Sequence, residues 1–530
     1  MKTEHKQLAT NPLVFMIWRN ARDHGTNQQK GESILSKFIS ATTTAIAYLL
    51  LLFASNVKAT EFELTPNPNP SQNVISVTSG NVGINSADPF TNFGGIYVQA
   101  GGMLRNVGQM DITIIEGRSN LAYVAIDEGA VLDARARSKM NFDSVSTFSV
   151  FGTVNNLGSI SSDWLVTLGE TSQFNNGVSG VFNNKKAGYY RGIFVNSGSV
   201  INSTPGSGTG GYIEQHGDFQ NRTGGSFVNQ GVVSNFGIIA NRGTISNEVY
   251  FNTGVGRGEF TNENSGTINN ESGGAITNRQ RWFNEGNFNN AGTFMNQQGG
   301  IGLSNLATGR INNLAGGVFQ NDSSLYNAGG ITNAGTFYAG TVSGDGSYEQ
   351  LSGETIVDEY FHTGEALFRG GVVSGNGILS GPIAQIDIAA TLSPGQSAGQ
   401  LTFSGDLVMN GTLRAEIADS ENFDSIVVGG TLTLGSTSVL DISLLGGFDP
   451  DSAMSFDLVQ SDHIIGTFGS VVMPSSLSGR FHLVQLVDYS GTTDVLRLVA
   501  TVPEPSSALM LFSGLGLFLL RRRRMAQQNA

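Results

Sequence analysis

The chain has 530 residues, of which 71 are glycine and 13% are charged, and it contains no cysteine. Disulfides, thiolate nucleophiles and cysteine-ligated zinc or iron–sulfur sites are therefore excluded. Residues 60–520 hold 18 basic and 39 acidic residues, a net charge of −21. Because phosphate backbones repel so acidic a chain, the composition argues against nucleic-acid binding.

Residues 1–59 are predicted to be a signal peptide. A basic leader precedes the apolar run "AIAYLLLLFAS", and "NVKA" follows it. The small residues Val57 and Ala59 suit a signal-peptidase site, so we expect export by the Sec machinery and cleavage after Ala59. An uncleaved membrane anchor is the alternative. Residues 60–101, which include the stiff stretch "TPNPNPSQN", are predicted to be a linker and N-terminal cap.

Residues 102–340 contain a short repeat, Gly-x-φ-x-Asn, in which φ is Val, Ile or Phe. The stretch "GSFVNQGVVSNFGIIANRGTISN" holds four copies at a spacing of six, with asparagines at Asn229, Asn235, Asn241 and Asn247. Other copies follow at a spacing of eight. Both spacings are even, so the inward and outward alternation of a β-strand survives each step, whereas a helical period does not fit.

The repeat predicts an all-β fold, a β-solenoid. Each unit is too small to bury its own φ residue, but stacked units form a continuous core. We expect the apolar φ residue of each repeat to point inward. Gly and Asn are expected to form corners at which the backbone dihedral angle φ is positive, and asparagines at equivalent corners are expected to form amide ladders. Three six-residue faces would make a rung of about eighteen residues. The alternative is a disordered Gly/Asn-rich tract.

These repeats resemble the Gly-x-Ile-x-Asn repeats of secreted bacterial adhesins and autotransporter passengers. The resemblance implies a parallel β-helix, for which a right-handed winding is favoured. In residues 341–500 the asparagines become rare and longer alternating segments appear, as at Leu401 and Phe403. This region is similar to the end of autotransporter passengers and is predicted to be a C-terminal β region and cap.

Residues 501–530 combine three features in order: "VPEP" from Val502, a short apolar run over 506–520, and an arginine cluster. They resemble the PEP-CTERM sorting signal of Gram-negative bacteria. The resemblance implies one transmembrane helix and processing by an exosortase. It assigns the recognition element to Val502, Pro503, Glu504 and Pro505, and the stop-transfer signal to Arg521, Arg522, Arg523 and Arg524. An uncleaved tail anchor is the alternative.

The body of the chain shows no pattern typical of catalysis, so no catalytic residue, metal site or cofactor is predicted and the protein is not expected to be an enzyme. Within 225–333 the only aspartate is Asp322, and the glutamates are scattered. The histidines lack metal-ligand spacing: His216, His362, His463 and His482. Two aromatic pairs would suit stacking on sugar rings if exposed, although core packing is favoured: Trp282 with Phe283, and Tyr189 with Tyr190.

These observations predict an exported structural or adhesive protein that passes through an inner-membrane intermediate to the cell surface, outer membrane or extracellular matrix. Exopolysaccharide, biofilm or another copy of the chain is the expected partner. One alternative is a carbohydrate-binding or carbohydrate-active β-helix. Another is ice binding, with which the sorting-tail family is associated by name; the threonines of this chain, however, occur singly after glycine, as at Thr244 and Thr267.

Overall fold

The structure is a computed structural model. It describes residues 59–64, 74–86, 90–92, 94–112, 122–142, 146–203, 211–248, 258–297, 301–451, 453–489 and 491–501, and the single residues 517, 519, 521 and 524. By internal contacts the chain divides into two compact units, Met1–Thr60 and Glu61–Ala530. The boundaries proposed above between signal peptide, linker, repeats and cap stay predictions.

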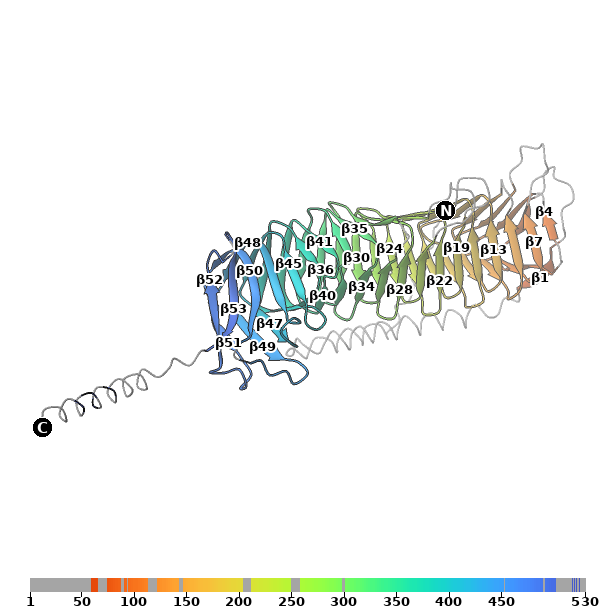
Figure 1. Ribbon diagram of the computed structural model, residues 1–530. Coiled ribbons are helices and arrows are strands. Elements are labelled where there is room, and N and C mark those ends of the chain that lie inside the picture. The colour runs from red at the N-terminus through yellow and green to blue at the C-terminus, as the bar shows by residue number, and fades with distance from the viewer. Residues whose placement is uncertain are drawn as a thin grey trace, which may run out of the picture. The chain divides into compact units, whose positions relative to one another are not determined.

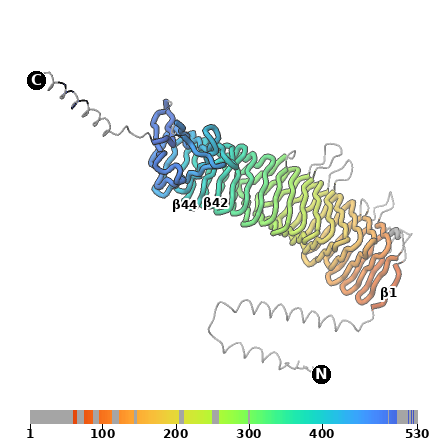
Figure 2. Tube along the Cα trace, turned by 60° about the horizontal axis from the view of Figure 1, so that its bottom comes forward, coloured from red at the N-terminus to blue at the C-terminus, as the bar shows by residue number. Residues whose placement is uncertain are grey.

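The second unit is built from short β-strands that wind into a parallel β-solenoid of about 15 turns (Figure 1). Each turn of the repeat region has three strands, and each strand pairs in parallel with the third strand after it. Figure 2 shows successive turns of the backbone stacked along this region. The predicted fold class is therefore confirmed, whereas the right-handed winding stays a prediction.

The three strands of a turn define three faces. Face A contains β1 (Thr60–Glu63), β3 (Asn81–Asn85), β6 (Met103–Asn106), β9 (Val131–Ala134), β12 (Thr153–Asn156), β15 (Gln173–Asn176), β18 (Ile193–Asn196), β21 (Asp218–Asn221), β24 (Ile238–Asn241), β27 (Thr267–Asn270), β30 (Asn287–Asn290), β33 (Arg310–Asn313), β36 (Gly330–Asn333) and β39 (Ser347–Gln350). Face B contains β4 (Phe90–Asn92), β7 (Gln109–Ile112), β10 (Lys139–Phe142), β13 (Ser159–Ser162), β16 (Val181–Asn184), β19 (Ser199–Asn202), β22 (Ser226–Asn229), β25 (Thr244–Asn247), β28 (Ala275–Asn278), β31 (Thr293–Asn296), β34 (Val318–Asn321), β37 (Thr336–Tyr338) and β40 (Glu354–Ile356).

Face C contains β2 (Ile75–Val77), β5 (Gly95–Val98), β8 (Tyr123–Ile126), β11 (Thr147–Val150), β14 (Leu165–Leu168), β17 (Ala187–Tyr190), β20 (Tyr212–Gln215), β23 (Val232–Asn235), β26 (Glu259–Asn262), β29 (Arg281–Asn284), β32 (Gly302–Asn305), β35 (Ser324–Asn327), β38 (Thr341–Ser343), β41 (Tyr360–His362) and β43 (Ile378–Ser380).

The strands lengthen toward the C-terminal end, as the sequence predicts for this region. β42 (Glu365–Gly375) pairs with both β39 and β40, so one bent strand covers two faces. The remaining strands are β44 (Ile383–Pro394), β45 (Gln400–Phe403), β46 (Asp406–Met409), β47 (Thr412–Ile417), β48 (Ser425–Leu434), β49 (Val439–Leu444), β50 (Ser455–Ile465), β51 (Ser470–Val472), β52 (Phe481–Leu486) and β53 (Asp494–Ala500). β53 pairs in antiparallel fashion with β50 and β52, which ends the parallel stacking.

The core is a stack of φ residues, one from each strand of a turn. In β25 the φ residue Ile245 is 1% exposed and lies in register between Phe227 and Ile276. Aromatic residues stack in the same way, with ring centroids 5.0 Å apart for Phe319 and Phe337. The burial of these side chains confirms that the φ residues point inward. Alternation along a four-residue strand gives two inward side chains, of which the φ residue is one.

The second inward side chain of most repeat strands is the asparagine, which is buried. Along a ladder, each asparagine except the last donates from Nδ2 to Oδ1 of the asparagine one turn later, at 2.7–2.9 Å. Three such ladders run along the solenoid. They join Asn156 to Asn333 on face A, Asn184 to Asn321 on face B, and Asn235 to Asn327 on face C. The predicted ladders are confirmed, but the asparagines occupy inward positions at the ends of strands rather than corners.

The expectation that the repeat's Gly and Asn adopt positive φ is wrong. Among the described residues, the non-glycine residues at positive φ are Arg137 and Asp488. At several of the eight-residue spacings an additional glycine makes the turn, such as Gly224 at φ 83° just before the repeat residue Gly225. The repeat glycines are needed for a different reason, because the preceding turn passes too close for a Cβ atom.

Gly243 illustrates this close approach and gives a testable prediction. A Cβ atom here would lie 2.2 Å from the carbonyl oxygen of Gly225 and 2.6 Å from that of Arg222. Because backbone atoms cannot move aside cheaply, we expect Gly243→Ala to destabilise the fold by about 3 kcal/mol. At Gly224 there is open space, and the cost of alanine is only the positive φ, about 1 kcal/mol.

Substitution by asparagine distinguishes the cost of a positive φ at Gly224 from the cost of the close approach at Gly243. Asparagine tolerates a positive φ better than alanine does, but its side chain is larger. Thermal melting should show Gly224→Asn to be milder than Gly224→Ala, and Gly243→Asn to be worse than Gly243→Ala. The same ranking at both positions would contradict the close-approach explanation.

Candidate functional site

The predicted sorting signal follows directly on the last strand of the solenoid. β53 ends at Ala500, and the exposed Thr501 comes next. Leu517, Leu519, Arg521 and Arg524 are helical and exposed. Within the part of the chain that the structure describes, no helix has the length and apolar character required to cross a membrane.

The proposed roles of individual signal residues stay predictions. Six of these residues lie outside the described residues: Val502, Pro503, Glu504, Pro505, Arg522 and Arg523. Ala59, the predicted signal-cleavage residue, is exposed and immediately precedes β1. Because β1 begins at Thr60, cleavage after Ala59 would leave all of the described strands in the mature chain.

Three of the five glutamates within 225–333 form ion pairs with arginines of neighbouring turns. Glu248 pairs with Arg279, and Glu259 Oε2 lies 3.9 Å from a guanidinium nitrogen of Arg281. These pairs are substantially exposed, so each contributes at most about 1 kcal/mol. They serve the solvated surface, as the sequence suggests.

The four histidines among the described residues are distributed along the second unit rather than gathered. His216 Nε2 lies 2.6 Å from Glu214 Oε1, and its ring stacks on Phe236. His362 Nε2 lies 3.0 Å from Asp345 Oδ1. His463 lies in β50 and His482 in β52. Among the described residues, no group of three or more histidine, aspartate or glutamate side chains is placed to hold a metal ion.

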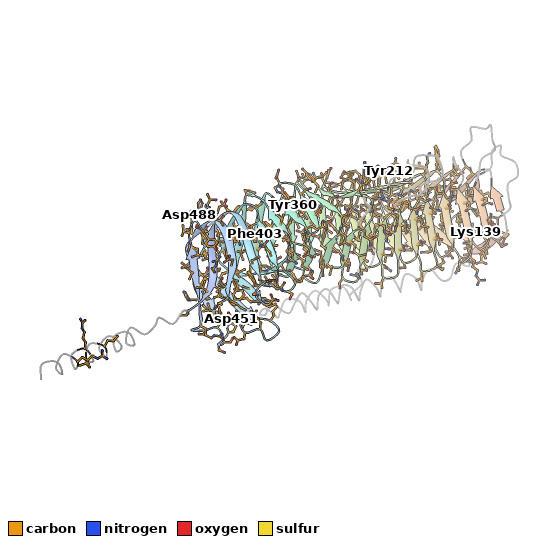
Figure 3. The ribbon with its side chains drawn as sticks, viewed as in Figure 1. Lys139, Tyr212, Tyr360, Phe403, Asp451 and Asp488 are labelled. Carbon is orange, nitrogen blue, oxygen red and sulfur yellow. The ribbon has the colours of Figure 1, made fainter. Side chains whose placement is uncertain are left out.

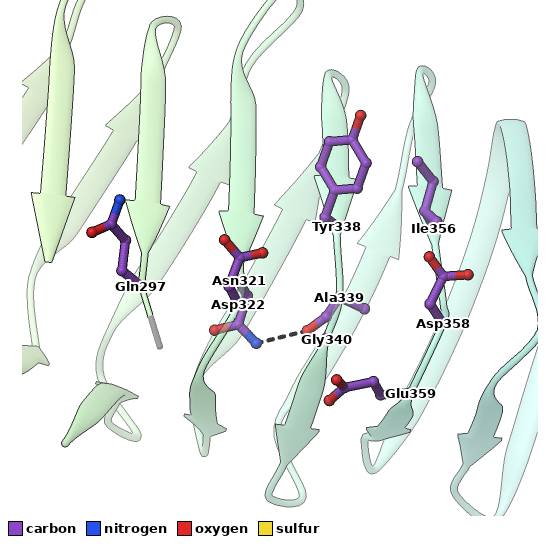
Figure 4. A pocket seen from close by; sticks show the side chains of 9 residues that line it. All are labelled: Gln297, Asn321, Asp322, Tyr338, Ala339, Gly340, Ile356, Asp358 and Glu359. Atoms are coloured by element: carbon purple, nitrogen blue, oxygen red, sulfur yellow. Dashed lines mark hydrogen bonds between the residues drawn. The ribbon is translucent and has the colours of Figure 1, made fainter. Parts of the chain in front are cut away.

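One pocket of about 610 Å³ lies where the asparagine ladder of face B ends (Figure 4). In the next turn the ladder position falls on Ala339, directly after β37, and Asn321 Nδ2 donates to the Ala339 carbonyl oxygen at 2.7 Å. Three carboxylates line the pocket, and all three accept hydrogen bonds from side chains: Glu359 from Thr341, Asp358 from Gln396, and Asp322 from Gln320. The pocket is best explained as a consequence of the ladder's end.

Asp424 has the most strongly shifted carboxyl pKa in the described part of the chain. The side chain is 1% exposed, and burial raises its pKa to about 7, against the influence of two backbone N–H donors. Its Oδ1 accepts from Gly399 N at 2.8 Å and its Oδ2 from Glu416 N at 3.0 Å. Both oxygens thus bind backbone, which indicates a structural role.

The raised pKa predicts a pH dependence of stability. A carboxyl with a raised folded-state pKa stabilises the fold fully below its unfolded pKa of 3.8, and this contribution is lost as pH rises through about 7. Asp424→Asn does not titrate. We therefore expect the melting temperature of wild type, relative to Asp424→Asn, to fall between pH 5 and pH 8. A constant difference would show that the carboxyl titrates normally.

Face C carries a concentration of outward tyrosines that the sequence pattern alone does not indicate. We call face C from β5 to β43 the tyrosine face. Its outward strand positions hold six tyrosines: Tyr97, Tyr123, Tyr189, Tyr212, Tyr326 and Tyr360. The described strands of face A present none outward, and those of face B present Tyr338. Of the predicted aromatic pairs, Trp282 and Tyr190 are buried, whereas Phe283 and Tyr189 point outward.

The fold and the terminal segment together define an all-β solenoid that ends in a sorting signal. Residues 501–524 match a family described as the PEP-CTERM protein-sorting motif. A sorting motif of this kind implies export to the cell surface and processing by an exosortase-type enzyme. The predicted resemblance to this signal is confirmed.

The solved structures that are similar to this chain include a TibA fragment and the Hap adhesin. The hyper-glycosylated TibA fragment, whose glycosylation is catalysed by TibC, is 13% identical; the alignment covers 78% of this chain and 98% of that one, with a TM-score of 0.21. The Hap adhesin of Haemophilus influenzae is 12% identical, with 83% of this chain covered and a TM-score of 0.26. This chain spans 61% of the Hap chain, less than two thirds of its length. No curated protein matches the sequence.

Proposed function

We propose that the protein is a non-enzymatic structural or adhesive component of the cell surface or extracellular matrix, working in association with exopolysaccharide or biofilm. The observation that carries this proposal is the sorting motif at residues 501–524, directly after the last strand of a long solenoid. A stack of repeated turns presents long, regular faces to solvent. Such faces suit a scaffold or an adhesin better than an enzyme, which needs an enclosed catalytic pocket.

The proposed route has three steps. The Sec machinery exports the chain, cleavage follows Ala59, and the arginine cluster Arg521 to Arg524 holds the C-terminal segment in the inner membrane. An exosortase then recognises Val502 to Pro505 and releases the body to the surface or matrix. The motif supports the last step; the first two rest on the sequence pattern alone.

The test is to express the full chain and a variant lacking residues 501–530 in a host that has an exosortase. Protease treatment of intact cells should degrade the solenoid of the full chain at the cell surface. The truncated chain should instead accumulate in the periplasm, protected from the protease. Equal surface exposure of both chains would overturn the proposed sorting role.

A further inference from the structure

The tyrosine face differs from the other two faces in its aromatic content. Tyr189, Tyr326 and Tyr360 are 36%, 46% and 42% exposed, so much of each ring faces solvent. Figure 3 labels Tyr212 and Tyr360, which lie along the same upper side of the ribbon in that view. An exposed aromatic ring offers a flat apolar surface with a polar end, which suits contact with the C–H face of a sugar ring.

The outward positions of this face carry little charge, although the body of the chain is strongly acidic. Three of them are charged, Glu214, Glu259 and Arg281, and the last two lie 3.9 Å apart. A net charge of −21 over residues 60–520 repels anionic polymers at long range. The charge pattern therefore favours an uncharged ligand.

The rest of the face supplies hydrogen-bonding groups. Hydroxyl side chains occupy many outward positions, at Thr147, Ser149, Thr167, Ser234, Thr261, Ser304, Ser324, Thr341, Ser343 and Ser380. Hydroxyls both donate and accept, so they can match the hydroxyls of a glycan. Parallel strands repeat every ~4.8 Å along the face, a spacing of the same order as one sugar unit of an extended chain.

Several tyrosines are held in place before any ligand arrives. Tyr97 donates its hydroxyl hydrogen to Asp127 Oδ2 at 2.8 Å, and Tyr212 donates to Glu214 Oε2 at 3.2 Å. The rings of Tyr189 and Tyr212 meet edge to face, with centroids 6.4 Å apart. Side chains that are already ordered lose less entropy on binding.

We infer that the tyrosine face binds an uncharged polysaccharide, whose chain lies along the face with sugar rings against the tyrosine side chains. This inference rests on the proposed function and names its partner and contact surface. The three most exposed rings, Tyr189, Tyr326 and Tyr360, make the largest contributions.

The test is affinity electrophoresis of the purified full chain in detergent, in native gels that contain hydroxyethylcellulose, dextran or alginate. The triple variant Tyr189→Ser/Tyr326→Ser/Tyr360→Ser removes the exposed rings of this face. Tyr338→Ser is the matched control, because Tyr338 is 38% exposed but lies on face B. We expect a neutral polymer to retard wild type and Tyr338→Ser equally. The triple variant is expected to bind that polymer at least about tenfold more weakly than wild type. Alginate should retard none of them.

Three results would overturn the inference: no retardation of wild type by either neutral polymer, equal loss in Tyr338→Ser, or equal retardation by alginate. A fourth such result could come from sedimentation velocity. If wild type is a dimer and the triple variant a monomer, the tyrosine face is a self-association surface. If the triple variant melts early, the single variants Tyr326→Ser and Tyr360→Ser replace it. The gel is independent of cellular sorting, so a chain that binds in the gel but is not sorted would refute the proposed function alone.

Discussion

Replacing Asn241 by alanine is expected to destabilise the solenoid by about 4 kcal/mol. Asn241 Nδ2 donates to Asn270 Oδ1 at 2.8 Å and to the Ala275 carbonyl oxygen at 3.2 Å. Its Oδ1 accepts from Asn221 Nδ2 at 2.7 Å and from Gly243 N at 3.2 Å. All of these groups lie inside the stack, and each buried polar group left without a partner costs about 1–3 kcal/mol.

The matched control for this variant is Asn269→Ala, one residue before the next ladder asparagine. Asn269 points outward and accepts from Asn289 Nδ2 at 2.9 Å, but it is only half-buried, so water can replace that bond. Thermal melting followed by circular dichroism should show a large loss for Asn241→Ala and little change for Asn269→Ala. Equal effects would mean that the inward ladder contributes no more than surface amides do.

Replacing Ile245 by aspartate is expected to have the larger effect, about 5 kcal/mol. The side chain is 1% exposed and lies between Phe227 and Ile276 of the adjacent turns, where no cation can pair with a carboxylate. Because each turn contacts only its neighbours, the damage should begin locally. Hydrogen exchange should therefore show loss of protection in β22, β25 and β28 first.

Thr244→Asp controls for the added charge, because Thr244 is exposed and adjacent to Ile245 on the same strand. It should leave the melting temperature nearly unchanged. If Ile245→Asp kept the β content and melting temperature of wild type, the inward direction of φ would be wrong.

The solenoid could be predicted because spacings of six and eight preserve strand alternation, and Phe227, Val233, Ile239 and Ile245 all point inward as that alternation requires. The role of the asparagines was only partly predictable. Alternation places Asn229 on the same side as Phe227, which would have predicted burial, whereas the positive-φ expectation came from the general habit of Asn in turns. The bonding partner of Asn229, Asn247 one turn later, depends on strand register.

The reason for the repeat glycines and the existence of the tyrosine face also depend on register. Gly243 is constrained by Gly225, eighteen positions earlier, and nothing local to the sequence indicates the contact. Tyr189 and Tyr212 are separated by 23 positions and meet only because β17 pairs with β20. Assigning every third strand to one face would have revealed the tyrosines, but that assignment requires the order of all turns.

The central claim is that this solenoid is sorted to the cell surface through its C-terminal signal. The most direct test is mass spectrometry of the mature C-terminus of protein recovered from the surface of its native host. We predict an end near Val502 to Pro505, without the apolar run and the arginine cluster. A chain that is intact through Ala530 would contradict the account, because it would show that the C-terminal signal is not processed.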